Sequence, residues 1–163
     1  ELRYCVHLRY LSARNNAICD ISGLCELRKL EEIDLRSNQI EQLPVEKEKK
    51  EKQMFPVLHT LRLSHNRIRD VSAFLAAIAS ANMSVLDVGN NRIAVFPECV
   101  LQWKALCVLD VSNNDLSRIP FELGLMTSLN ALLLNGNRLR MMQTVINSAN
   151  TAKILQWLKN RLV

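Results

Sequence analysis

The sequence is poor in the residues that interrupt regular structure, and it has no long apolar run. Its 163 residues include four Gly and four Pro, too few for extended low-complexity segments. No run of about 18 apolar residues occurs, which excludes a membrane-spanning helix, so no membrane association is expected. The chain opens on Glu1 rather than Met, without an apolar signal core. We therefore expect a piece of a longer protein.

Cysteine and histidine are too scattered for a metal site or a disulfide framework. The five Cys are odd in number, have no CxxC spacing and share no metal-like register with His. We expect reduced, mostly buried thiols in a reducing compartment, which favours the cytoplasm, with the nucleus as an alternative.

Catalytic motifs are missing as well. The sequence has no Ser-His-Asp set, no paired-carboxylate motif and no glycine-rich phosphate loop. We therefore predict no catalytic residue, no metal, no cofactor and no enzymatic activity.

What the chain does contain is enough apolar sequence for a sizeable core. Hydrophobic residues make up 48% of it and charged residues 23%, and 21 basic against 16 acidic side chains give a net charge of +5. This mildly basic balance permits contact with acidic partners or nucleic acid without requiring either.

The organisation of the chain is a repeat that reads L-x-x-L-x-L-x-x-N-x-L. Its Asn recurs at intervals of 22, 28, 25, 23 and 23 residues, in six registers: Asn16, Asn38, Asn66, Asn91, Asn114 and Asn137. Another apolar residue follows each Asn five positions later: Ile21, Leu43, Val71, Phe96, Ile119 and Met142. Over nearly its whole length the sequence resembles the leucine-rich repeat family.

The resemblance implies an α/β leucine-rich-repeat solenoid, a segment of a right-handed curved horseshoe. A parallel sheet would line its concave face, with short helices and 3₁₀ turns on the convex face. Physical arguments agree, because the two apolar residues of L-x-L point the same way from a strand and only stacked repeats can bury them. The Asn amides would satisfy backbone groups at each turn and link coil to coil. Close backbone passage would explain Gly89 and Gly136 beside these turns.

Between the strands, we predict a helix over Val71–Asn82 and short helical turns after Pro97 and Pro120. The run Glu46–Lys52 holds four Lys and three Glu. It is interpreted as a solvated helical insertion, with a docking site as the alternative.

The repeats occupy residues 1–147, and residues 148–163 are predicted to form a C-terminal capping helix. Asn150 or Ser148 would cap a helix that runs to Val163. Trp157 would lie at the edge of its apolar stripe, which comprises Ile154, Leu155, Leu158 and Leu162. Such a helix would shield the core of the last coil from water.

The closing sequence narrows the resemblance. Residues Val108–Leu116 and Thr151–Arg161 are similar to the end of the leucine-rich repeat-containing protein forty family, although Arg138 stands where that family usually has Pro. Cysteine clusters typical of secreted repeat proteins are missing at both ends. The resemblance implies the C-terminal part of a longer intracellular solenoid, with upstream repeats as its neighbours and no chemistry to carry over.

Function should therefore reside on the concave surface, in a module that binds another protein. The N-terminal half of this surface is polar and the C-terminal half carries an apolar strip beside two Asp, and exposed apolar strips are unusual unless something covers them. The candidate binding residues are Tyr10, Arg14, Asp34, Arg36, Arg62, Val85, Asp87, Val108, Asp110 and Leu133.

Three alternatives remain open. The concave face could be plain solvated sheet, with Asp34, Arg62 and Asp87 forming a cross-strand charge ladder. The chain could be a structural segment that only caps a longer solenoid. RNA binding is the third and is disfavoured, because Asp34, Asp87 and Asp110 oppose phosphate and only Tyr10 offers a stacking ring.

Overall fold

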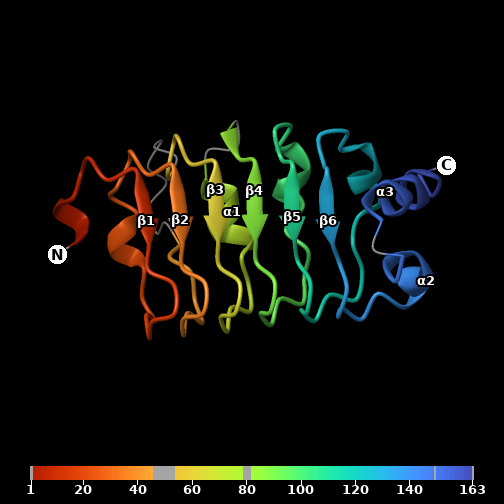
Figure 1. Cartoon of the computed structure of the whole chain (residues 1–163), viewed down its shortest axis with the longest axis horizontal. Helices are drawn as coiled ribbons and strands as arrows, with labels where there is room; N and C mark the ends of the chain where they lie inside the picture. Colours follow the sequence, from red (N-terminus) through yellow and green to blue (C-terminus); the bar gives the residue numbers. More distant parts are fainter. Residues whose placement is uncertain (1, 46–53, 79–81, 149, 163) are drawn as a thin grey trace.

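The described part of the chain is a stack of coils along one axis, with strands on one side and short helical segments on the other. The computed structural model describes residues 2–45, 54–78, 82–148 and 150–162. In this part, six three-residue strands form one parallel sheet in sequence order, with helical segments behind it and at its two ends (Figure 1). The strands are β1 Tyr10–Ser12, β2 Glu32–Asp34, β3 Thr60–Arg62, β4 Val85–Asp87, β5 Val108–Asp110 and β6 Ala131–Leu133.

The strand register is the one that the repeat pattern predicts. Leu11 pairs with Ile33, Ile33 with Leu61, and the series continues to Leu132. In β2 to β6 the central residue points into the core and is buried. The apolar residue five positions after each Asn is buried in all six repeats as well. The core therefore lies between the sheet and the convex segments.

The Asn column forms the predicted ladder from Asn38 onward, whereas Asn16 donates only to Ala13 and Arg14 of its own repeat. The Oδ1 atom of Asn91 accepts a hydrogen bond from the backbone N–H of Ile68 at 3.0 Å, one repeat earlier. Its Nδ2 group donates to the carbonyl oxygens of Leu63 and Val88, both at 3.0 Å, and of Gly89 at 3.1 Å. The same cross-repeat pattern holds for Asn38, Asn66, Asn114 and Asn137. Each amide thus ties one coil to the preceding one.

The residue before each Asn of the column has a left-handed backbone. The φ angles are 58° at Asn15, 56° at Ser37, 57° at His65, 52° at Asn90, 50° at Asn113 and 72° at Gly136. Asn and Gly tolerate this region best, and they occupy four of these six positions. At Gly136 a Cβ atom would also lie 2.0 Å from Oδ1 of Asn113, so the predicted close passage is confirmed there.

The convex side contains the short helical turns predicted after Pro97 and Pro120, whereas the helix predicted over Val71–Asn82 is shorter than expected. The helical segments before the C-terminal end are η1 Leu2–Tyr4, η2 Ser22–Leu24, α1 Ser72–Ala77, η4 Glu98–Gln102 and η5 Phe121–Leu125. The prediction of a helix to Asn82 was wrong. Ile78 is extended and bridges to Met54, whose backbone N–H donates to the carbonyl of Ala77 at 2.9 Å, so that pairing ends α1. The run 46–52 lies outside the described residues.

The C-terminal end is closed by three segments. They are η6 Arg140–Met142, α2 Gln143–Ile146 and α3 Thr151–Lys159. Sequence analysis predicted only the last of these, and it predicted a helix that runs to Val163, whereas α3 ends at Lys159. Asn150 is the N-cap, since its Oδ1 accepts from the N–H of Lys153 at 3.0 Å. In the predicted stripe, Ile154 and Leu158 are buried, whereas Leu162 lies beyond the helix and is exposed.

Helix α3 covers the edge of the sheet and packs on the last convex turn. The hydroxyl of Thr151 accepts a hydrogen bond from the backbone N–H of Leu132 at 3.0 Å, which satisfies a donor of the edge strand β6. A Cβ atom at Gly124 would lie 2.4 Å from the backbone nitrogen of Lys159, so this contact requires glycine.

The thiols differ from expectation. Cys5 and Cys19 are exposed and the other three Cys are half-buried, so the prediction of mostly buried thiols was wrong. Cys25 and Cys99 pack against the core and are only partly buried. Within the described residues, no group of three or more metal-ligating side chains is assembled, and no helix could cross a lipid bilayer.

Candidate interaction surface

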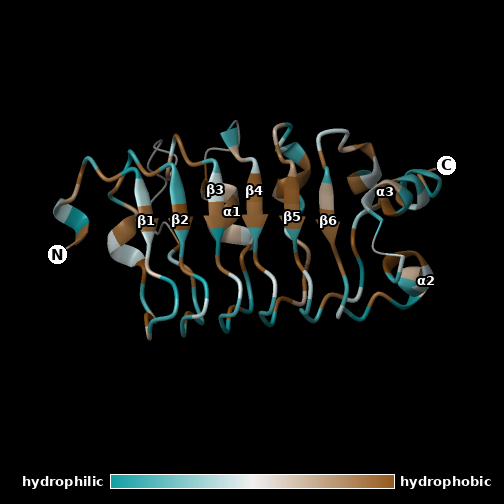
Figure 2. Cartoon of the chain, viewed as in Figure 1, coloured by the Kyte–Doolittle hydropathy of each residue, from teal (hydrophilic) through white to brown (hydrophobic). Residues whose placement is uncertain are grey.

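The outward strand positions form two rows across the concave face. The first row contains Tyr10, Glu32, Thr60, Val85, Val108 and Ala131, and the second contains Ser12, Asp34, Arg62, Asp87, Asp110 and Leu133. Figure 2 shows that β1 and β2 are largely hydrophilic and that β4 and β5 are hydrophobic. The change in character predicted along the groove is therefore present in the sheet.

Near β1, a small network holds the first aromatic ring of the face. The hydroxyl of Tyr10 donates to Oε2 of Glu31 at 2.9 Å, and Nε of Arg9 donates to Oε1 of the same carboxylate at 2.7 Å. The hydrogen bond to Glu31 raises the pKa of Tyr10, and the bonds from Arg9 and Tyr10 lower the pKa of Glu31. Sequence analysis selected Tyr10 and missed Arg9 and Glu31, which lie just before their strands. Arg14 follows β1 and is exposed.

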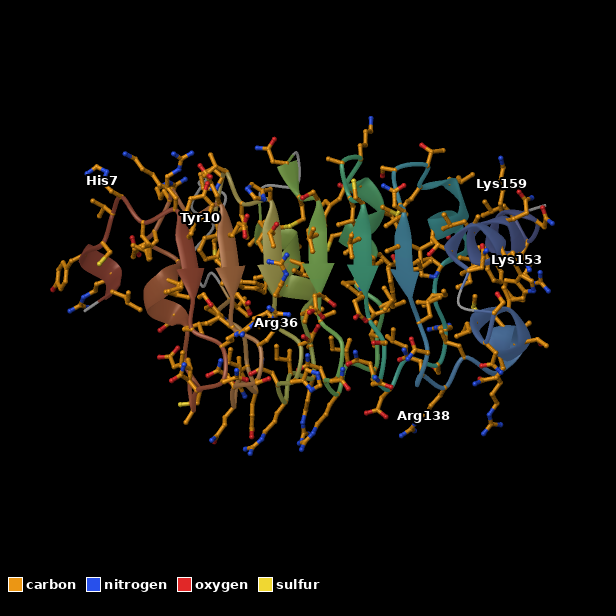
Figure 3. The ribbon with its side chains drawn as sticks, viewed as in Figure 1. His7, Tyr10, Arg36, Arg138, Lys153 and Lys159 are labelled. Atoms are coloured by element: carbon orange, nitrogen blue, oxygen red, sulfur yellow. The ribbon has the colours of Figure 1, made fainter. Side chains whose placement is uncertain are left out.

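In the polar half, Asp34 is paired within its own repeat. Arg36 donates to both oxygens of Asp34, from Nε at 2.9 Å and from Nη2 at 2.6 Å, and these bonds lower the pKa of Asp34. Arg62 instead approaches Glu32, with 3.8 Å between Nη1 and Oε2. Asp34, Arg62 and Asp87 are register partners, as the alternative of a charge ladder requires, but the ion pairs formed here among the described residues are those of Arg36 with Asp34 and of Arg62 with Glu32. Figure 3 shows Arg36 at the lower ends of the central strands.

The apolar half is a continuous strip. Val85, Val108 and Ala131 are register partners in three adjacent strands, and each is half-buried. Leu133, in the second row of β6, is 39% exposed. Their side chains lie on the face opposite to the buried central residues of the strands. This strip can contact a partner without any change in the core.

The carboxylates beside the strip have different environments. Asp87 accepts a hydrogen bond from the hydroxyl of Ser64 at 2.7 Å and from the N–H of Gly89 at 3.2 Å. Burial nevertheless raises its pKa, and the nearby charge of Asp110 adds to this effect. Asp110 accepts from the N–H of Ser112 at 2.8 Å.

Some outward positions of the strands and of the residues that follow them are closed. Thr60, Ser64 and Ser112 are buried, and so is Gly89. A Cβ atom at Gly89 would lie 3.0 Å from Oδ1 of Asp110 and 3.1 Å from the hydroxyl of Ser112, so side chains of the next coil leave little space there. The accessible part of the concave face is thus narrower than the repeat pattern suggests.

Comparison with protein families identifies the class. Leucine-rich repeat models match residues 6–47 ("Leucine Rich repeats (2 copies)"), 56–74 ("Leucine Rich repeat") and 81–139 ("Leucine rich repeat"). The chain belongs to the leucine-rich repeat family, whose members generally mediate protein–protein interactions.

Solved structures agree with this assignment. An internalin of Listeria monocytogenes superposes with a TM-score of 0.72 and 25% identity, over 83% of this chain and 37% of that chain. A leucine-rich repeat protein of Leptospira interrogans superposes with a TM-score of 0.76 and 26% identity, over 90% of this chain and 36% of that one. Such repeat folds are typically interaction modules without catalysis.

Curated relatives share only the repeat region. The chain is 32% identical over 87% of its length to the probable serine/threonine-protein kinase pats1 of Dictyostelium discoideum. It is 30% identical over 64% of its length to the MAP kinase phosphatase with leucine-rich repeats protein 1 of the same organism. The chain spans 4% of the first and 13% of the second, so the activities in those names describe those proteins.

Proposed function

We propose that this chain is a non-catalytic module that binds another protein through the C-terminal half of its concave face. The observation that carries the proposal is the apolar strip of Val85, Val108, Ala131 and Leu133, which crosses three adjacent strands. Parallel strands lie about 4.8 Å apart, so the strip spans roughly 10 Å, the width of one or two apolar side chains of a partner. Asp87 and Asp110 at its border favour a partner with basic groups around its apolar contact.

We further propose that the module is the C-terminal segment of a longer intracellular protein related to leucine-rich repeat-containing protein forty. Two observations support the position at the C-terminal end and the intracellular location. Helix α3 covers the β6 end of the sheet, whereas at the β1 edge Leu11 is only half-buried, which suits further repeats. No disulfide occurs among the described residues, which is compatible with a reducing cytoplasm or nucleus.

The test is a pair of charge substitutions. Val108→Glu places a carboxylate in the centre of the strip, and its effect on the free energy of unfolding should stay within about 0.5 kcal/mol because Val108 lies outside the core. In a complex formed at the strip, the new carboxylate would be buried without a partner charge, so the partner protein should no longer bind. Arg67→Glu is the matched control, since Arg67 lies at the Asn turns and is paired at 3.6 Å with Glu41.

The readout is quantitative affinity purification from cell extract, with both variants beside the original chain. Partners lost with Val108→Glu and kept with Arg67→Glu would support the concave site. Equal retention by both variants would contradict it and favour the alternative, a structural segment that only caps a longer solenoid. The close packing of α3 on Gly124 supports that alternative.

A further inference from the structure

The net charge of the chain is concentrated at its C-terminal end. Residues 117–163 hold one acidic side chain, Glu122, and six basic ones: Arg118, Arg138, Arg140, Lys153, Lys159 and Arg161. This segment alone accounts for the net +5, and residues 1–116 carry fifteen basic and fifteen acidic side chains. Figure 3 places Arg138 at the lower edge of the solenoid and Lys153 and Lys159 on α3. An electrostatic attraction for anionic groups therefore belongs to this end.

An apolar pocket of about 340 Å³ opens at the same end, away from the concave strip. It is formed where the segments after Asn114 and Asn137 meet the outer side of α3. Its apolar lining is Ile119, Phe121, Leu139, Met141, Met142 and Trp157. The side chain of Met141 is 80% exposed at the mouth, whereas Leu139 and Met142 are buried beneath it. This volume suits one large apolar side chain of a ligand.

The aromatic wall of the pocket is held in place. Phe121 and Trp157 pack edge to face, with 6.4 Å between ring centroids. Arg161 lies over the indole at 3.3 Å from the ring centroid and donates from Nη1 to the carbonyl of Trp157 at 3.2 Å. Because these contacts fix the indole, the wall is already formed before a ligand arrives.

Three arginines surround the pocket: Arg118, Arg138 and Arg140. Arg138 is paired with Asp115 at 2.8 Å. Across the described residues, no carboxylate lies within ion-pair distance of Arg118 or Arg140. These two guanidinium groups can therefore each bind a carboxylate of a ligand at the rim.

A second groove of about 580 Å³ continues from the pocket and shares Ser117, Arg118, Ile119 and Phe121 with it. It runs toward the preceding coil over Val95 and Phe96. Glu98 and Glu122 line this groove together with the shared Arg118, so two carboxylates accompany one guanidinium there, whereas the residues lining the pocket include three arginines and no carboxylate. A ligand that is negative at one end only would thus bind in one orientation.

We propose that this pocket is a second docking site, which takes a short acidic peptide segment of a partner protein. One large apolar side chain fills the space between Leu139 and Trp157, and neighbouring Asp or Glu side chains pair with Arg118 and Arg140. The peptide continues across Ile119 toward Val95, where its sequence carries no acidic residue. The site lies outside the concave strip and does not depend on the function proposed for that strip.

The experiment begins with a library of random twelve-residue peptides displayed on phage and selected on the full chain. We expect the selected peptides to contain one Trp, Phe or Leu flanked on one side by Asp or Glu. Fluorescence anisotropy of one labelled peptide then measures its affinity for the original chain and for two double variants. Each double variant replaces two Arg by Glu, one variant at the pocket and the other at control positions. Arg118→Glu/Arg140→Glu should weaken binding about tenfold or more, and added salt should weaken binding to the original chain.

The matched control is Arg67→Glu/Arg69→Glu, which makes the same charge change in repeat three. Arg69 follows Asn66 as Arg140 follows Asn137, and both Arg67 and Arg69 are exposed. This control should change the dissociation constant by less than about twofold. Met141→Ser removes an exposed apolar contact without touching the core, and it should weaken binding several-fold. Val108→Glu should leave peptide binding unchanged, which separates this site from the concave one.

Several results would overturn the proposal. One is the selection of peptides that lack an acidic residue beside an apolar one. Another is an equal loss of peptide affinity in the two charge-reversed variants. A third is tight binding of a peptide whose apolar residue is replaced by Gly. Phosphatidylserine vesicles and polyuridylic acid serve as competitors. If neither competitor displaces the selected peptide, the result supports the peptide site. If no peptide is selected and one of the competitors binds directly at this rim, the site would be assigned to a lipid surface or to RNA instead.

Discussion

From Asn38 onward, the side chain of each column Asn forms hydrogen bonds to two neighbouring coils. It accepts a backbone N–H from the preceding coil and donates to carbonyl groups of two coils at once. Leu and Ala have no such groups, and Asp could accept but not donate. The left-handed residue before it completes the turn, so the two neighbouring positions act as one unit.

Asn91→Ala should lower the free energy of unfolding by about 1–3 kcal/mol, because buried backbone groups of two coils lose their partner. Thermal or urea unfolding measures this effect. Asn16→Ala is the control. The amide of Asn16 donates to Ala13 and Arg14 of its own repeat and is exposed, so the loss should be smaller. An equal effect of both changes would contradict the role of the cross-repeat bonds.

The ionisation of Asp87 should make the free energy of unfolding depend on pH. Burial raises its pKa above the ordinary value near 3.8, so the folded chain holds this proton more tightly than the unfolded chain. As the pH rises through the interval between the two pKa values, ionisation of Asp87 therefore costs stability, and the cost persists at higher pH.

Asp87→Asn should remove this cost. We expect a gain at pH 7 of no more than about 1 kcal/mol, since solvent still screens this partly exposed group, and no gain below the ordinary pKa of Asp. Unfolding curves across pH 3–8 test it. Asp34→Asn should act oppositely, because Arg36 lowers the pKa of Asp34 and its ionised form stabilises the fold at neutral pH. The same sign for both variants would refute the assignment.

At the scale of elements, the three-residue strands depend on their neighbours. A strand of this length is too short to persist alone, and each gains order from the coils on either side. The final strand has a coil on one side only, and α3 takes the place of the missing neighbour by hydrogen bonding through Thr151. The capping helix is therefore part of the sheet's stability.

Gly124→Ala should destabilise the chain by about 1–3 kcal/mol, because the added Cβ would lie 2.4 Å from the backbone of Lys159 and force α3 away. Gly23→Ala is the control, since a Cβ at Gly23 meets nothing within 4 Å. Thermal melts of both variants test the contact. Indistinguishable melts would show that α3 is not tightly docked on η5.

The local sequence is not sufficient to predict where the helices begin and end. The apolar spacing of 71–82 is helical, yet Ile78 leaves the helix to pair with Met54, a residue more than twenty positions earlier. Helix α2 went unpredicted because its four residues carry too little periodicity to recognise. In both cases the outcome depends on what the neighbouring coil offers.

At the scale of the whole molecule, the two proposed surfaces lie on different sides of the solenoid and differ in charge. Asp87 and Asp110 border the concave strip, while Arg118 and Arg140 border the pocket beside α3. A repeat protein suits this separation, because each coil contacts only its neighbours and changes in one surface do not propagate far.

Combining Val108→Glu with Arg118→Glu/Arg140→Glu should give additive effects on unfolding, within about 0.5 kcal/mol of the sum. Denaturant unfolding of the original chain, the two parent variants and the combined variant tests this. Coupling larger than about 1 kcal/mol would mean that the two surfaces are one cooperative unit rather than separate sites.

The sequence by itself determined the repeat register, the inward residues and the Asn ladder, because these follow from spacing within each repeat and from the period of a strand. It also located the apolar strip at Val108. Tertiary structure alone decided which outward positions stay open, since Ser64 and Gly89 are closed by the next coil. It also decided that Arg36 pairs with Asp34 and that Trp157 forms a pocket with Leu139. Those outcomes depend on distances between side chains in the folded structure, and the spacing of residues along the sequence does not determine these distances.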